Sequence, residues 1–224
     1  IFFAITMVFL SIVAANEIYT FDSGLYHTQN IKWIRTFSVV PGLANIQPQF
    51  GFNSMFFPIT ALFTLDIPSF AGERDVLVYP LNIVLFLAIS TRLFSVALKN
   101  LRSSNFLDSI FYSILLVLIF LVLPKHISSP SPDIACTLII IYVAYLFLEN
   151  QIFQSRFFIY LIIVLSTILV SYKLSTIMIG LLSIILLYQY KNVLLFYKSS
   201  LIALLIITPY LVRNYYLSGY MVFP

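Results

Sequence analysis

The sequence predicts an all-α protein, a polytopic bundle of transmembrane helices with an amphipathic interfacial helix in its first extracytoplasmic loop. Hydrophobic residues make up 61% of the 224 residues and charged residues only 9%, a balance typical of proteins that cross a membrane several times. One long polar stretch, Asn16–Gly51, carries Asp22, His27, Lys32 and Arg35, and isolated ionisable residues then stand at or near the ends of apolar runs, namely Asp133, Lys173 and Arg213. Because charges next to hydrocarbon are costly, these positions are the first candidates for function.

Several apolar runs are candidate membrane spans. A spanning helix needs about 20 apolar residues to cross roughly 30 Å of hydrocarbon. The runs that approach this length are Ile1–Ala15, Val76–Leu98, Phe106–Leu123, Ile134–Leu148 and Ser200–Leu211. The first is interpreted as the end of a first transmembrane helix, because it lacks the cleavage site of a signal peptide. We expect a single transmembrane domain over residues 1–224, as a fragment of a longer chain.

Two other runs do not fit one straight span. As a single helix, Phe157–Tyr188 would be about 48 Å long, so two shorter helices broken near Lys173 fit better. The run Phe52–Ala71 is interrupted by two prolines and Asp66, which favours a re-entrant or interfacial segment.

The distribution of basic residues predicts the orientation. If Phe52–Ala71 does not cross, the loop 16–51 and the segment Pro124–Asp133 face the same side. The opposite side then holds a dense basic set in short loops, which marks the cytoplasm. This set is Lys99, Arg102, Arg156, Lys191 and Lys198. The first loop is therefore predicted to be extracytoplasmic. The scattered basic residues, with a net charge of +4, indicate contact with membrane lipids and not with nucleic acid.

Within the first loop, the segment from Asp22 to Phe37 predicts an amphipathic helix that lies along the membrane. Asp22 or Ser23 can cap its N-terminus, and Tyr26, Trp33, Ile34 and Phe37 fall on one face. Trp33 suits the boundary between headgroups and hydrocarbon.

The same segment contains the first candidate catalytic residue. A carboxylate at Asp22, at the membrane surface, can act as a general base towards an acceptor hydroxyl or ligate a divalent metal. Helix spacing puts Tyr26 one turn later with His27 beside it. The competing interpretation is that Asp22 only caps the helix and His27 is solvated.

Asp133 is the second candidate. It opens the Ile134 helix after Ser129-Pro130-Ser131-Pro132, where the helix dipole favours a carboxylate. It can be a simple cap, but the predicted topology puts it on the same side as Asp22. Two such carboxylates around one cleft make a better candidate active site than either alone.

Two basic residues are candidates for binding phosphate. Lys173 stands where a long apolar run must break, and Arg213 closes the last helix, where a guanidinium can bind phosphate bidentately. For both, anchoring of the topology is the alternative. The sequence contains no Gly-rich phosphate loop, no zinc-spaced Cys/His cluster and no Gly-x-Ser-x-Gly elbow.

Together these pieces resemble the membrane half of the C-type (GT-C) glycosyltransferases, the superfamily of protein O-mannosyltransferases and lipid A aminoarabinose transferases. The resemblance is strongest to a bacterial family of multi-pass membrane proteins related to these enzymes. The motifs that carry it are Tyr19–His27, Val39–Asn45, Phe50–Ser54, Ser129–Asp133 and Pro209–Pro224.

The resemblance implies roles for individual residues. Asp22 would be the catalytic base or a metal-site acid, and Asp133 would line the same cleft. Lys173 or Arg213 would hold the phosphate of a polyprenyl-phosphate sugar. The remaining expected substrate-binding residues are Tyr26, His27 and Asn53. The superfamily often has two adjacent acids in the first loop, whereas Ser23 follows Asp22 here, so the need for a divalent metal stays open.

The expected function is that of a glycosyltransferase in the bacterial inner membrane, which moves a sugar from a polyprenyl-phosphate donor to an extracytoplasmic acceptor. A single displacement would invert the anomeric centre. The alternatives are a transporter or flippase of lipid-linked saccharides, which would use the same basic residues without breaking a bond, and a non-catalytic protein of envelope assembly.

Overall fold

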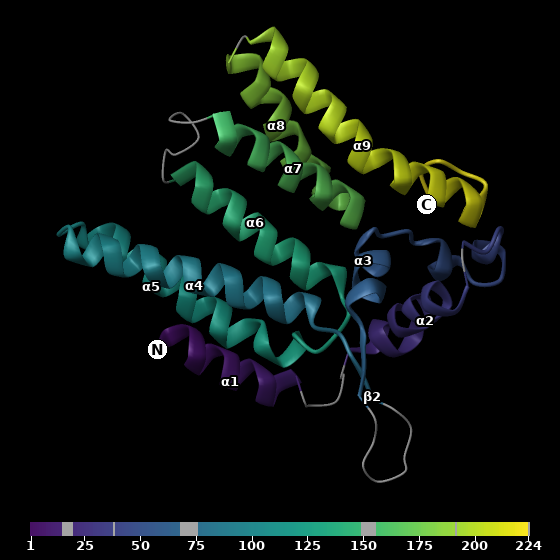
Figure 1. Cartoon of the computed structure of the whole chain (residues 1–224), viewed down its shortest axis with the longest axis horizontal. Helices are drawn as coiled ribbons and strands as arrows, with labels where there is room; N and C mark the ends of the chain where they lie inside the picture. The colour runs from purple at the N-terminus through teal and green to yellow at the C-terminus, as the bar shows by residue number, and fades with distance from the viewer. Residues whose placement is uncertain (15–19, 38, 68–75, 149–155, 191, 224) are drawn as a thin grey trace.

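The computed structural model describes residues 1–14, 20–37, 39–67, 76–148, 156–190 and 192–223. This described part is 82% helical. Apolar helices lie roughly side by side, and two short helices, α2 and α3, lie together at one end of the array (Figure 1). The apolar helices are α1 (Phe2–Ala14), α4 (Leu81–Arg102), α5 (Phe106–Val122), α6 (Pro132–Leu148), α7 (Arg156–Tyr172), α8 (Ile177–Tyr190) and α9 (Val193–Ser218).

The first loop folds into short elements. A π-helical turn, η1 (Ser23–His27), continues directly into α2 (Thr28–Thr36), so a helix covers most of the predicted amphipathic segment. Two 3-10 turns follow, η2 (Leu43–Asn45) and η3 (Pro48–Gly51).

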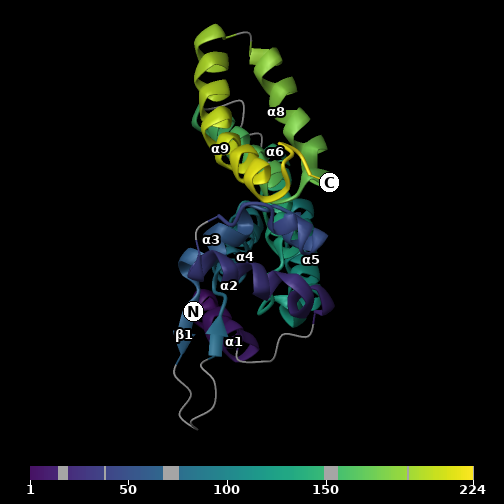
Figure 2. The ribbon, with the colours of Figure 1, turned by 90° about the vertical axis from the view of Figure 1, so that its right-hand side faces the viewer.

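The run Phe52–Ala71 does not form a spanning helix. Its first part contains α3 (Phe56–Phe63), whose eight residues extend only about 12 Å. The strand β1 (Leu65–Ile67) follows and pairs antiparallel with β2 (Val76–Val78). This hairpin projects from the body of the molecule (Figure 2). The last four residues of the run, 68–71, lie outside the described residues.

Two of the predicted spans have different limits in the structure. The helix expected over Val76–Leu98 begins only at Leu81, because the first residues form β2 and Pro80 precedes the helix. The last helix begins seven residues before the predicted Ser200, because the side chain of Asn192 accepts a hydrogen bond from the backbone of Leu195 at 3.0 Å and caps it.

The break near Lys173 is confirmed. Helix α7 ends at Tyr172, Lys173 is extended, and the 3-10 turn η6 (Leu174–Thr176) leads into α8. The loop before α6 contains a further 3-10 turn, η4 (Pro124–His126).

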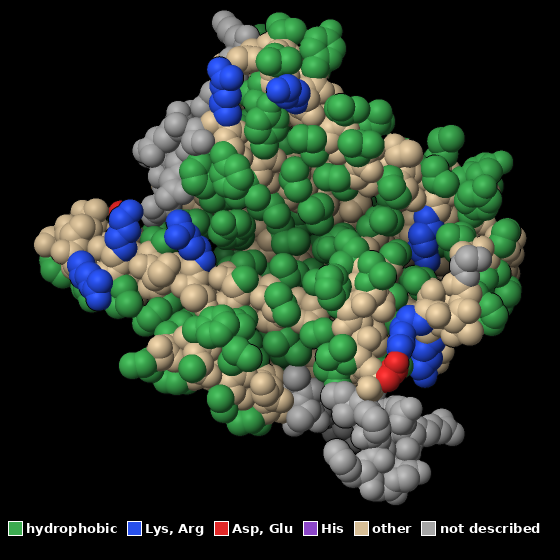
Figure 3. Space-filling model, viewed as in Figure 1, with side chains coloured by type: hydrophobic (Ala, Val, Ile, Leu, Met, Phe, Trp, Pro, Cys, Tyr) green, Lys and Arg blue, Asp and Glu red, His purple; other side chains and the backbone are tan. Residues whose placement is uncertain are grey.

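Some of the described helices have the length and composition of membrane spans. Within the described residues, three segments are long and apolar enough to cross a membrane, namely Leu81–Arg102, Phe106–His126 and Val193–Ser218. The other apolar helices, α1, α6, α7 and α8, are shorter. Figure 3 shows a broad hydrophobic face, with lysine and arginine side chains gathered towards its margins. Exposure of so many large apolar side chains is expected where lipid replaces water.

The core lies between α4, α6 and α7. Phe86 and Leu93 of α4, Leu138 of α6, and Ile159 and Leu169 of α7 are fully buried there. The start of α4, the start of α6 and the end of α7 lie at the end of the bundle that carries α2 and α3 (Figure 1).

Candidate functional site

A cavity of about 380 Å³ opens where the loops meet at the end of the bundle. It is bounded by segments far apart in the sequence: η1, the start of α3, the start of α6, the break after α7, and α9. Six of the seven predicted site residues line it. They are Asp22, Tyr26, His27, Asn53, Asp133 and Lys173.

The π-helical turn decides which side chains of the first loop enter the structure. Asp22 has helical backbone angles and its side chain makes no capping hydrogen bond, so the interpretation of Asp22 as a cap is wrong. Ser23 and His27, one turn apart, are both buried, whereas Asp22 stays exposed on the cavity wall. Single π turns inside helices are frequent at functional sites.

His27 is packed and not solvated, contrary to the simpler interpretation of the sequence. Its side chain contacts the rings of Tyr26 and Phe57, with centroids 4.4 and 5.4 Å away. Only 3% of the residue is exposed. Burial lowers the pKa of His27 to about 4, against the opposing effect of the Asp22 and Asp133 carboxylates and with a smaller contribution from Lys173. The imidazole is therefore neutral at pH 7.

Three hydroxyl groups surround the Nδ1 side of His27. Ser23 Oγ lies 3.3 Å from His27 Nδ1 and 2.5 Å from Ser129 Oγ. Thr20 Oγ1 donates to Ser23 Oγ and lies 3.0 Å from Ser129 Oγ. The sequence did not predict this cluster, because Ser129 comes from the loop before α6 and its approach to the first loop is a tertiary contact.

Asp133 and Lys173 form an ion pair in the wall of the cavity. Lys173 Nζ lies 2.5 Å from Asp133 Oδ1, and the side chains are 47% and 59% exposed, respectively. Ser131 Oγ accepts from the backbone N–H of Asp133 at 3.3 Å, so Ser131 and not Asp133 caps α6. The carboxylate of Asp133 therefore lines the cavity as the partner of Lys173 and is not used as a helix cap.

Tyr26 contributes a phenol to the same wall. Its ring meets Phe52 and Phe57 edge to face. Burial, with the negative charges of Asp22 and Asp133, raises the pKa of Tyr26 to about 12. The phenol is therefore protonated at neutral pH and can donate a hydrogen bond to a ligand oxygen.

Arg213, the seventh predicted residue, lies outside this cavity but is connected to it. Its guanidinium donates a hydrogen bond to the side-chain oxygen of Asn53. The amide nitrogen of Asn53 donates to the carbonyl of Tyr210 at 2.9 Å. Asn53 thus forms part of the wall of one cavity while it holds the side chain of Arg213 in the next.

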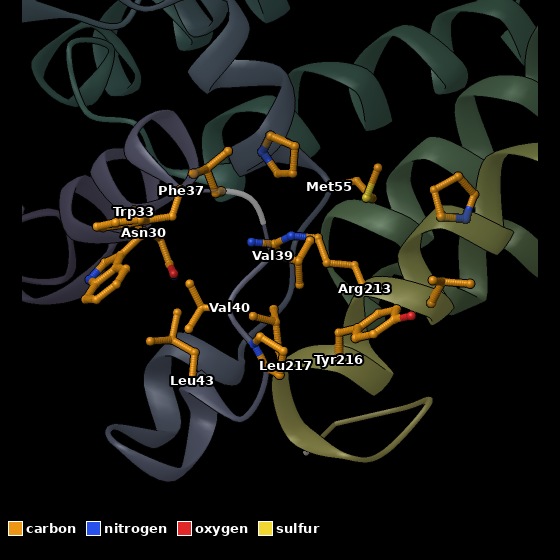
Figure 4. Close-up of a pocket in the computed structure, with 15 residues that line it drawn as sticks. Asn30, Trp33, Phe37, Val39, Val40, Leu43, Met55, Arg213, Tyr216 and Leu217 are labelled. Carbon is orange, nitrogen blue, oxygen red and sulfur yellow. The ribbon is translucent and has the colours of Figure 1, made fainter.

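This second cavity, of about 650 Å³, lies between α2 and α9 (Figure 4). Its lining is almost entirely apolar and includes Trp33 from α2, Phe37 just after that helix and Leu217 from α9, and the side chain of Arg213 reaches into it. The apolar face of the first-loop helix was predicted from the sequence. In the structure, much of that face lines a cavity within the protein.

The described residues do not provide a preformed metal site. No group of three or more His, Cys, Asp or Glu side chains among them is arranged to hold an ion. A divalent metal at Asp22 or Asp133 would therefore need oxygen ligands from water or from the phosphate of a donor.

Comparison with known proteins gives a family and no functional relative. A family model described as a domain of unknown function (DUF8201) matches residues 1–224. No curated protein and no solved structure gives a significant match to the chain.

Proposed function

The chain belongs to the DUF8201 family, and we propose that it is a polytopic glycosyltransferase of the bacterial inner membrane, which moves a sugar from a polyprenyl-phosphate donor to an extracytoplasmic acceptor. One observation carries the proposal. The cavity of about 380 Å³, here called the polar cavity, contains the carboxylates of Asp22 and Asp133 and adjoins the cavity of about 650 Å³, here called the apolar cavity. The hydrogen bond between Asn53 and Arg213 links the walls of the two. A lipid-linked sugar has the same two parts, a polar head and an apolar chain.

The apolar cavity suits the prenyl chain. Most of its lining is aromatic or aliphatic, with Asn30 and Tyr216 as uncharged polar side chains, and Arg213 is the single charged residue among those that line it. A guanidinium at the edge of an apolar groove can bind phosphate bidentately while the chain stays among apolar groups. The sugar of such a donor would then extend past Asn53 into the polar cavity.

The polar cavity suits the transfer itself. Asp22 orients or deprotonates the acceptor hydroxyl, whose oxygen attacks the anomeric carbon. The bond from that carbon to the phosphate oxygen breaks, and its electron pair leaves with the phosphate. Lys173 has three donors, so it can stay paired with Asp133 and still stabilise the phosphate with Arg213. A single displacement of this kind inverts the anomeric centre.

The proposed orientation follows from the basic residues. Lys99 and Arg102 lie in the last turn of α4, at the opposite end of that helix from Asn82, which donates to the backbone of Ser129 and Ser131 beside the cavity. With the basic end in the cytoplasm, the polar cavity opens on the extracytoplasmic side.

The test uses purified protein in lipid nanodiscs with a radiolabelled polyprenyl-phosphate sugar and an envelope fraction as acceptor. We expect the wild type to transfer label and Asp22→Asn to lose transfer while it still binds the donor. Asp108→Asn changes a carboxylate in the first turn of α5, outside the cavity, and should transfer normally.

Two other outcomes would contradict the proposal. If the protein moves the lipid-linked sugar between leaflets and leaves the sugar–phosphate bond intact, it is a flippase or transporter. If Asp22→Asn transfers as fast as Asp108→Asn, the cavity is not the active site, and a role in envelope assembly without catalysis gains support.

A further inference from the structure

The hydroxyl cluster beside His27 contains too few protons for its contacts. Thr20, Ser23 and Ser129 carry one hydroxyl proton each. Four hydrogen-bond contacts nevertheless join these three oxygens and His27 Nδ1. Because each hydrogen bond needs one proton, the three hydroxyls can supply only three of the four.

The fourth proton must come from His27. If Thr20 donates to Ser23, Ser23 to Ser129 and Ser129 to Thr20, each hydroxyl proton is used within this closed set of three hydroxyl groups, here called the hydroxyl ring. The remaining contact, from Ser23 Oγ to Nδ1, is then a bond that the imidazole donates. Ser23 Oγ accepts two bonds and donates one, which is the full capacity of a hydroxyl.

This arrangement fixes the tautomer of the neutral imidazole of His27. The hydrogen bond at one imidazole nitrogen determines which nitrogen carries the proton. With the proton on Nδ1, the lone pair is on Nε2. The ring lines the polar cavity and is held between Tyr26 and Phe57, so the orientation of this lone pair is set before a substrate binds.

We propose that His27 is the proton acceptor of the polar cavity, with Thr20, Ser23 and Ser129 as positioning residues that keep the proton of its neutral imidazole on Nδ1. The inference rests on the proposed function for the identity of the proton donor, the acceptor hydroxyl. In the transfer, Nε2 takes the hydroxyl proton as the oxygen bonds to the anomeric carbon and the phosphate leaves with its electron pair. Asp22 then orients the acceptor and stabilises the imidazolium.

The charges around His27 fit this role. Asp22 and Asp133 favour the protonated imidazole, Lys173 opposes it, and the phenol of Tyr26 beside it is neutral. The unliganded ring is neutral at pH 7 and so starts in the form that accepts a proton. The negative phosphate of a bound donor would raise the pKa of His27 from this lowered value and favour proton transfer.

The first test is spectroscopic and does not depend on activity. The chain has two histidines, so protein labelled with ¹⁵N-histidine gives two imidazoles, and His126→Gln assigns the signals. At pH 7.5 we expect His27 to show a protonated Nδ1 and a bare Nε2. A bare Nδ1 with a protonated Nε2 would overturn the inference, because Ser23 would then donate to the ring.

A variant of the hydroxyl ring supplies a second spectroscopic test. Ser129→Ala leaves two hydroxyl protons for two contacts, so Ser23 is free to donate to Nδ1 and the signals should shift towards the other tautomer. Ser128→Ala removes the neighbouring buried hydroxyl, which is outside the ring, and should leave the spectrum unchanged. Equal spectra for both variants would contradict the role of the ring.

The activity test separates this inference from the proposed function. In the sugar-transfer assay, His27→Gln should lower turnover on the order of 100-fold or more with donor binding retained, while His126→Gln transfers normally. Normal turnover in His27→Gln would overturn the inference and leave the proposed function intact. If the wild type transfers no sugar, the proposed function fails, and the tautomer measurement by itself supports or overturns the assignment of His27.

Discussion

The guanidinium of Arg213 donates a hydrogen bond to the side-chain oxygen of Asn53, whose amide nitrogen donates to the carbonyl of Tyr210 on the same helix. These two hydrogen bonds join the segment between η3 and α3 to α9, and Asn53 and Arg213 line neighbouring cavities. The segment that carries Asn53 and the helix that carries Arg213 are therefore held in one geometry.

Changing Asn53 to aspartate should weaken the binding of a lipid phosphate. The new carboxylate would pair with Arg213 and compete with the ligand for its positive charge. We expect Asn53→Asp and Arg213→Gln each to raise the dissociation constant for polyprenyl phosphate about tenfold, measured in detergent at low ionic strength.

A second arginine provides the control. Arg35 donates to Asp66 in the hairpin at 2.9 Å and does not line either cavity. Arg35→Gln should bind polyprenyl phosphate like the wild type. If all three variants bind polyprenyl phosphate equally weakly, the effect comes from the overall charge of the protein and Arg213 is not a specific phosphate-binding residue.

Breaking the pair of Asp133 and Lys173 should affect function more than stability. Both side chains are about half exposed, and such pairs contribute only about 0–1 kcal/mol to the free energy of unfolding. We expect Asp133→Asn and Lys173→Met to melt within a few degrees of the wild type but to lose most sugar transfer. A large fall in melting temperature with transfer retained would identify the pair as a structural anchor.

Acidification should destabilise the protein through His27. The pKa of His27 lies near 4 in the folded protein against 6.5 in the unfolded chain, so the unfolded state binds the extra proton first. The free energy of unfolding has its full value above pH 6.5. It decreases as the pH falls, by about 3 kcal/mol at pH 4.

This loss can be followed by thermal unfolding in detergent between pH 7.5 and 4. His27→Gln should reduce the dependence of melting temperature on pH over that range, and His126→Gln should retain it. An unchanged pH dependence in His27→Gln would show that other groups dominate the acid response.

Gly51 is a position where a methyl group does not fit. A Cβ there would lie 2.6 Å from the ring of Phe223 and 2.7 Å from the Cβ of Ala44. Gly51→Ala should destabilise the fold by about 1–3 kcal/mol and displace Phe223, which lines the polar cavity. Gly24→Ala is the matched control, since a Cβ at Gly24 meets nothing within 4 Å. Equal melting temperatures for the two variants would contradict this packing.

The orientation in the membrane can be tested with single cysteines in a Cys136→Ser background. Gln29, Lys125 and Ser175 are exposed near the cavity end, and Ser103 is exposed at the other end of α4. In intact cells, an impermeant thiol reagent should label the first three cysteines and not the fourth. Labelling of Ser103→Cys alone would reverse the proposed topology.

The sequence by itself determined the helices and their breaks. Apolar runs such as Phe106–Leu123 could be predicted as helices because hydrophobicity is a local property of the sequence. The charge of Lys173 inside a long apolar run is also a local signal, and it marks the end of α7. The limits were less certain where local capping decided them, as at Asn192. The types and positions of the candidate site residues were also readable, since a polar residue beside an apolar run stands out.

Only the tertiary structure decided how these residues meet. Asp22, Asp133 and Lys173 come together because the packing of α4, α6 and α7 brings their loops to one end of the bundle. Contacts between distant segments also decide three other features of the site. They are the burial of His27 in the π turn, the hydroxyl ring with Ser129 and the hydrogen bond between Asn53 and Arg213. Such contacts are selected by the shape of the whole packed core, which no local pattern of hydrophobicity encodes.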